Sequence, residues 1–166
     1  MAGDGWVWAG APDLIREAGA AIEAAGLTGF TAFALVTAYG ESRGNPHAVS
    51  SIGASGMFQV LPSTAELTQS ELFDPVTAIA SAADLVQRLR PFGWGPLVTY
   101  AGIRRGWRMP KYVDDVLWLR TFATLRRLMA AKRGAGVHWW DIYRPVPRIP
   151  LRGVEGWRQV IKAGMQ

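Results

Sequence analysis

The sequence predicts a mainly α-helical domain, and three observations support this prediction. Apolar residues recur at helical spacing in several segments, residues typical of helix starts and stops bound these segments, and strand signals are sparse. At 166 residues the chain is long enough for one domain with a sizeable core. We expect a helical domain over residues 1–134, and an extended arm with a short terminal helix over residues 135–166.

The first two helices are placed by their boundary residues. Pro12 favours the start of the first helix, and Gly26 is a natural stop for it. The second helix is expected from about Thr31 to Glu41. A small hairpin is possible in the glycine-punctuated segment 50–60 that follows.

The later helices are placed by capping patterns. Ser63 and Glu66 have the spacing of a capping box, which predicts a helix that begins near Ser63. Asp74 stands before Pro75, a pattern typical of a helix cap followed by proline at the first helical position. A longer helix is expected over about 110–134.

Charge and composition narrow the function classes. A formal net charge of +5 favours contact with polyanions in general, but no helix shows the dense basic and aromatic stripe expected for specific binding of nucleic acid. Cysteine is absent, and the two histidines, His47 and His138, lie far apart, so we expect no metal site and no cofactor. The apolar runs are too short for a membrane span, and residues 1–10 show no ordinary secretory signal.

The C-terminal part has a different composition from the rest. Pro145, Pro147 and Pro150 rule out a continuous helix there and favour an extended arm. Aromatic side chains flank this arm, and such surface is seldom left in solvent. We expect it to bind a partner protein through Trp139, Trp140, Tyr143 and Trp157.

Glu41 is the strongest candidate for chemistry. It stands where the apolar run 30–39 gives way to the turn-prone segment 42–46, and therefore in the last turn of the expected helix. We expect the negative end of the helix dipole, and side chains able to exclude water such as Met57 and Phe58, to disfavour the charged form of its carboxyl group. A carboxyl in this setting can act as the general acid that protonates a glycosidic oxygen.

The residues around Glu41 resemble those of a known family. The matching segments are Glu41-Ser42, Asn45-Pro46, Ala48-Val49-Ser50 and the run from Gly53 to Ala65. Together they closely resemble the first two motifs of the soluble-type lytic transglycosylases of the lysozyme-like superfamily. The resemblance implies a lysozyme-like helical fold and the cleavage of peptidoglycan.

The third motif of the family is altered in this chain. Tyr100 is followed by Ala101 and Gly102, whereas the family usually has asparagine, alanine and glycine after the tyrosine. The segment 94–100, in which Trp-Gly-Pro stands ahead of Val98, Thr99 and Tyr100, is similar to a divergent version found in phage tail and tape-measure lysis modules. This similarity implies a virion protein of a phage tail, with other tail proteins as partners, that acts in the bacterial cell wall.

The resemblance also implies a role for individual residues. Glu41 would protonate the oxygen of the β-1,4 bond between N-acetylmuramic acid (MurNAc) and N-acetylglucosamine (GlcNAc), and would then accept a proton in the second half of the reaction. The substrate-binding residues that it implies are Ser42, Gly53, Gly56, Met57, Gln59 and Tyr100.

Three functional hypotheses follow. The absence of an evident partner carboxylate near Glu41 favours attack by the muramoyl C6 hydroxyl group and a 1,6-anhydro product, because Asp74 is better explained as a helix cap. A lysozyme-like hydrolase, such as an endolysin, is the enzymatic alternative. A structural tail or baseplate protein that keeps the fold with weak or no activity is the alternative from another class.

Overall fold

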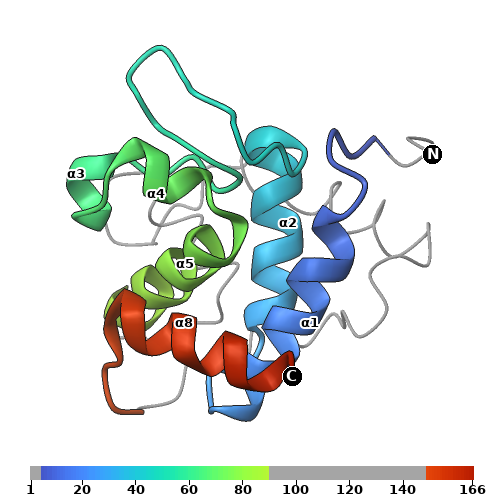
Figure 1. Ribbon diagram of the computed structural model, residues 1–166, viewed down its shortest axis with the longest axis vertical. Coiled ribbons are helices and arrows are strands. Elements are labelled where there is room, and N and C mark those ends of the chain that lie inside the picture. The colour runs from blue at the N-terminus through green and yellow to red at the C-terminus, as the bar shows by residue number, and fades with distance from the viewer. Residues whose placement is uncertain (1–4, 90–148) are drawn as a thin grey trace, which may run out of the picture.

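The computed structural model describes residues 5–89 and 149–166, and these residues are mainly helical, as predicted (Figure 1). The helices are α1 (Ala11–Ala24), α2 (Phe30–Ser42), α3 (Pro62–Ala65), α4 (Gln69–Phe73), α5 (Pro75–Leu89) and α8 (Gly153–Gly164). The described residues form no regular strand. In place of the expected hairpin, two isolated antiparallel bridges join Val49 to Ser55 and Ser55 to Val60.

Helix α2 lies in the core of the described fold. It packs against α1 and α5, while α8 packs against α5 and α1 (Figure 1). Phe30, Leu35 and Ala38 are fully buried, and the helix is apolar on most of its circumference. A helix of this composition is stable only when other elements cover it. The packing around α2 therefore fixes the place of its last turn, which carries Glu41.

Helix α1 begins close to where the sequence predicts. Pro12 stands in its first turn, and Ile15 and Ile22 lie in the core with no exposed surface. Near its end, the Glu23 carboxylate accepts hydrogen bonds from the Gly29 amide, at 2.8 Å, and from the Thr31 hydroxyl group. This carboxylate joins the end of α1 to the start of α2.

The capping box is not where the sequence analysis placed it. Ser63 lies inside α3, which begins at Pro62, and the helix ends before Glu66, whose φ of 55° is left-handed. The true capping box belongs to α4. The Thr68 hydroxyl oxygen accepts a hydrogen bond from the Glu71 amide at 3.1 Å, and the Glu71 carboxylate accepts one from the Thr68 amide at 2.7 Å. Proline at the first helical position moves the start of α3 ahead of Ser63, so that Ser63 cannot cap it.

The expected cap of α5 is confirmed. The Asp74 carboxylate accepts hydrogen bonds from the Thr77 amide at 3.0 Å and from the Thr77 hydroxyl group at 2.6 Å. Helix α5 then starts at Pro75. The Asp74 carboxylate is therefore occupied in holding a helix start.

The prediction that Trp157 binds a partner protein is wrong. Trp157 lies in α8 with none of its surface exposed, and its indole N–H donates a hydrogen bond to Gln87 Oε1 at 3.0 Å. Ile161, one helical turn later, is also fully buried. Residues four apart share one face of a helix, so these two side chains are the core-facing side of α8.

Gln87 holds the segment before α8 against α5. Its side chain is buried, and its Nε2 donates hydrogen bonds to the carbonyl oxygens of Ile149, at 3.1 Å, and Pro150, at 2.6 Å. Its Oε1 accepts the bond from Trp157 and a longer one, 3.4 Å, from the Arg152 amide. A buried amide with donors and acceptors both satisfied fixes a single arrangement of these segments.

Several sequence predictions fall outside the described residues. They are the helix over about 110–134, the domain boundary near residue 134, and the arm residues Trp139, Trp140 and Tyr143. Of the segments that the structure describes, none is a helix long and apolar enough to cross a membrane.

Candidate active site

Glu41 lies in the last turn of α2, where the sequence analysis places it. The helix ends at Ser42, and the next residue, Arg43, has a left-handed φ of 53°. The Arg43 amide donates to the Tyr39 carbonyl at 3.0 Å, and the Gly44 amide donates to the Ala38 carbonyl at 3.1 Å. These two bonds close the helix end, as in other helices that stop at left-handed residues. Glu41 itself is half-buried.

Ser42 connects this helix end to the loop that follows. Its hydroxyl group donates a hydrogen bond to the Met57 carbonyl oxygen at 2.7 Å, and it also lies 3.3 Å from the Ala38 carbonyl oxygen. The bond to Met57 bridges fifteen positions in the sequence. The residue next to Glu41 therefore ties the last turn of α2 to the glycine-containing motif.

The loop between α2 and α3, residues 43–61, is called the motif loop below. It is held by its own polar groups, and it projects beyond the helices at the top of Figure 1. Gln59 Nε2 donates to the carbonyl oxygens of Ala48, at 3.1 Å, and Gly56, at 3.0 Å. The Gly56 amide donates back to the Ala48 carbonyl at 2.9 Å. The Gln59 amide group is thus a clamp inside the loop, and its remaining acceptor, Oε1, is the atom suited to a sugar hydroxyl group.

The two glycines of the motif, Gly53 and Gly56, differ in the space around them. Both have positive φ, 87° at Gly53 and 80° at Gly56. A Cβ atom on Gly56 would lie 2.3 Å from the Leu72 carbonyl oxygen, whereas one on Gly53 would meet nothing within 4 Å. Gly56 is therefore required by the contact with α4, and Gly53 leaves open space beside the backbone.

Met57 lies beneath the surface of the site region. Its side chain is fully buried, and its neighbour Phe58 is 6% exposed. The carbonyl group of Met57, which receives the Ser42 hydroxyl, is its contact with the end of α2. The side chain of Met57 therefore lies in the core, while its carbonyl group holds the end of α2 through Ser42.

The structure brings most of the sequence-predicted site residues into one region. Hydrogen bonds connect Ser42 to Met57 and Gln59 to Gly56, and Glu41 precedes Ser42 in the chain. Gly53 lies in the adjoining turn, where its amide donates to the Ser50 carbonyl at 3.0 Å. Tyr100 lies outside the described residues.

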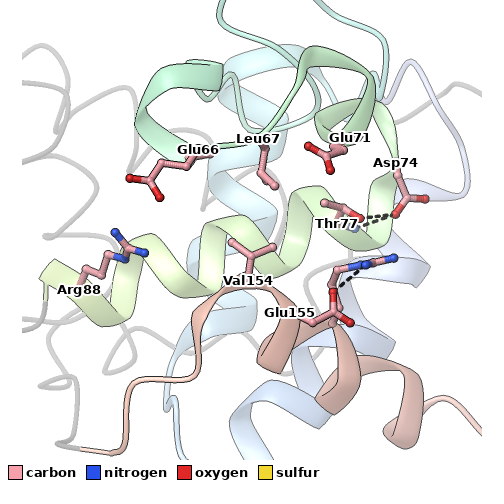
Figure 2. Close-up of a pocket in the computed structure, with 10 residues that line it drawn as sticks. Glu66, Leu67, Glu71, Asp74, Thr77, Arg88, Val154 and Glu155 are labelled. Atoms are coloured by element: carbon pink, nitrogen blue, oxygen red, sulfur yellow. Dashed lines mark hydrogen bonds and ion pairs between the residues drawn. The ribbon is translucent and has the colours of Figure 1, made fainter.

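A cavity of about 540 Å³ lies elsewhere, between the α3–α4 region, α5 and α8 (Figure 2). Its lining residues are Ala65, Glu66, Leu67, Glu71, Asp74, Thr77, Arg88, Val154, Glu155 and Arg158. Glu71 and Asp74 are already engaged as helix caps, and Glu155 pairs with Arg158 at 2.8 Å. None of the sequence-predicted site residues lines this cavity.

One contact of the site region has no signal in the sequence. Trp6, which precedes α1, is 2% exposed and packs against Tyr39 near the end of α2. A tryptophan ahead of the first helix has no local pattern that would reveal this distant contact. Only the fold brings the two rings together.

The mainly helical fold, with a glutamate in the last turn of its central helix, is consistent with a lysozyme-like domain. A model of the Transglycosylase SLT domain family matches residues 20–109, which is more than half of the chain, and the chain therefore belongs to this family. A search of curated proteins and a search of solved structures gave no match. The family consists of lytic transglycosylases, and the protein is accordingly a peptidoglycan-cleaving lyase.

Proposed function

We propose that Glu41 is the general acid with which this enzyme cleaves the β-1,4 bond between MurNAc and GlcNAc. The observation that carries the proposal is the position of Glu41. It lies half-buried in the last turn of α2, inside the family match, beside the serine that binds the motif loop. The turn that carries Glu41 is held by the backbone bonds of the helix end and, through the Ser42 hydroxyl group, by the loop, and a turn fixed at both places supports one orientation of the acid toward a substrate.

The proposed reaction uses this carboxyl group twice. Glu41 first gives its proton to the glycosidic oxygen, and the bond from that oxygen to C1 of MurNAc breaks. The resulting carboxylate then takes the proton of the muramoyl C6 hydroxyl group as its oxygen bonds to C1. The products are a GlcNAc end with a free hydroxyl group and a 1,6-anhydro-MurNAc end, and Glu41 is protonated again.

We propose substrate contacts for the surrounding motif. Gln59 Oε1 would accept a hydrogen bond from a sugar hydroxyl or N-acetyl group, since Nε2 is engaged within the loop. The open space beside Gly53 would admit the glycan backbone. Tyr100 would contact Glu41 or the sugar ring, as the family resemblance implies. Ser42 and Gly56 would keep the loop in register with the acid.

The assignment of the acid is tested by Glu41→Gln, which keeps the shape of the side chain and removes its transferable proton. We expect the rate of wall cleavage to fall by at least ~10²-fold, as for other general acids. Glu17→Gln, the same change at an exposed position on α1, is the matched control and should retain activity. A fully active Glu41→Gln variant together with an inactive Asp74→Asn variant would assign the acid to Asp74 instead.

We also propose that the enzyme is carried by a phage tail and acts when the particle meets the wall. The support is the similarity of segment 94–100 to tail lysis modules and the aromatic residues Trp139, Trp140 and Tyr143. Mass spectrometry of purified particles from an infected culture should detect the chain among the tail proteins. Its presence only in the free lysate would favour an endolysin, and its presence in particles without wall cleavage would favour a structural tail protein.

A further inference from the structure

The segment 5–8 packs over the end of α2 that carries the proposed acid. Trp6 is 2% exposed, and its ring meets that of Tyr39 edge to face, with 5.1 Å between the ring centroids. The Val7 amide donates a hydrogen bond to the Arg43 carbonyl oxygen at 2.8 Å. The segment therefore contacts Tyr39 within α2 and Arg43 just after the helix, which stand on either side of the proposed acid in the sequence.

The fit between this segment and the helix end is close. A Cβ atom on Gly44 would lie 2.7 Å from the Trp6 ring, and one on Gly5 would lie 2.6 Å from the Tyr39 hydroxyl oxygen. The guanidinium group of Arg43 covers the Tyr39 ring at 5.7 Å from its centroid. Tyr39 is thus held between Trp6 and Arg43, and it cannot shift unless these neighbours shift as well.

The helix end needs such support because its backbone is strained. Arg43 is not a glycine, yet it has a left-handed φ of 53°, a conformation that persists only where its surroundings hold it. The motif loop holds this turn at Ser42, and the segment 5–8 holds it at Tyr39 and Arg43. Two separate parts of the chain therefore fix the direction of the turn.

We propose that Trp6 is a positioning residue that sets the orientation of Glu41 through Tyr39 and the turn that follows it. The proposal rests on the proposed function of Glu41 and extends it to a segment outside the family match, which begins at residue 20. Trp6 touches no substrate in this account. Its effect is on the geometry of the acid, and a misplacement of about 1 Å can lower a rate by roughly 10²-fold.

The main test compares two buried tryptophans. Trp6→Leu removes the ring at the end of α2, and Trp157→Leu removes a similarly buried ring of α8 that faces α5. Turnover and KM are measured on soluble, uncrosslinked glycan strands at a temperature at which circular dichroism shows every variant to be folded. We expect Trp6→Leu to lower kcat by roughly 10- to 100-fold with KM changed by less than about twofold. Trp157→Leu should keep the wild-type kcat, and Trp6→Phe, which keeps an aromatic ring, should recover most of it.

A second pair of variants keeps the test decisive if either leucine variant does not fold. Gly5→Ala places a methyl group against the Tyr39 hydroxyl group, whereas Gly153→Ala has a similarly positive φ, 69° against 84°, and open space. Both variants carry the same kind of backbone strain. We expect only Gly5→Ala to lower kcat, by roughly tenfold, because only it displaces Tyr39.

The outcomes separate this proposal from the proposed function. Equal kcat for Trp6→Leu and Trp157→Leu, or for Gly5→Ala and Gly153→Ala, would overturn the positioning role of Trp6. So would a rise in KM alone, which would indicate a loss of substrate binding. Full activity of Glu41→Gln would instead overturn the proposed function, whatever the tryptophan variants show.

Discussion

The residues around Glu41 act mainly on the backbone and not directly on a ligand. Ser42 donates to the Met57 carbonyl, and Gln59 donates to two carbonyl groups of its own loop. These bonds are made in part-buried surroundings, where a carbonyl group that loses its partner destabilises the fold. The polar side chains of the motif therefore hold the backbone of the site in place, whether or not a sugar is bound.

Ser42→Ala tests this structural role, because it removes only the Ser42 hydroxyl group. The change leaves the Met57 carbonyl without the hydroxyl donor, so we expect the free energy of unfolding to fall by about 1–3 kcal/mol. Turnover should fall by roughly tenfold or more, because the turn that carries Glu41 loses one of its two supports. Thermal unfolding and cleavage of glycan strands measure the two effects. Ser63→Ala, at an exposed position of α3, should change neither, and equal behaviour of the two variants would contradict this role of Ser42.

At the scale of elements, helix starts could be predicted from the sequence where one residue type dominates the choice. Pro12, and Asp74 followed by Pro75, mark the starts of α1 and α5 correctly, because a proline at the first turn and a carboxylate cap act locally. The capping box predicted at Ser63 lies at Thr68 instead, because spacing alone does not reveal which residue stands outside the helix. Which residue caps a helix depends on where the preceding segment enters the helix, and this entry point is set by the fold.

The contact between the motif loop and α4 is tested by a pair of glycine variants. Gly56→Ala and Gly53→Ala introduce a Cβ atom at nearly equal positive φ, so each should lose about 1 kcal/mol for the strained backbone. Gly56→Ala additionally forces the new atom into the Leu72 carbonyl oxygen, and we expect a further loss of about 1–3 kcal/mol. Chemical denaturation of both variants measures the difference. A loss of equal size in the two would show that the loop and α4 are not in close contact.

At the scale of the molecule, α5 and α8 pack against each other in one core although the two helices are far apart in the sequence. The hydrogen bond from Trp157 to Gln87 spans seventy positions, and no local pattern announces it. From the sequence alone, Trp157 therefore resembles a residue of a docking surface, whereas in the fold it lies in the core. The position of Glu41 could be predicted because it depends on a helix end and its adjoining motif, whereas the supports of that end, Trp6 among them, depend on the tertiary fold.

The integration of α8 predicts a large stability effect for its tryptophan. Trp157→Ala should lower the free energy of unfolding by about 3–5 kcal/mol, as expected for a fully buried aromatic side chain. Domains of this size are stable by only about 5–15 kcal/mol, so removal of α8 as a whole should abolish folding and activity together. Leu151→Ala, at a 62% exposed position just before α8, should be nearly neutral. A chain shortened to remove α8 that still folds and cleaves the wall would contradict this account.

The chemistry proposed for Glu41 is tested most directly by the product formed from purified sacculi in water labelled with heavy oxygen. Mass spectrometry of the released fragments distinguishes an end closed by the C6 hydroxyl group from an end opened by water. We predict 1,6-anhydro-MurNAc ends without the label from the wild-type chain and from Glu17→Gln, and no fragments from Glu41→Gln. Labelled reducing ends would contradict the transglycosylase mechanism and assign the enzyme to the hydrolases, and fragments released by Glu41→Gln at the wild-type rate would contradict the role of Glu41 itself.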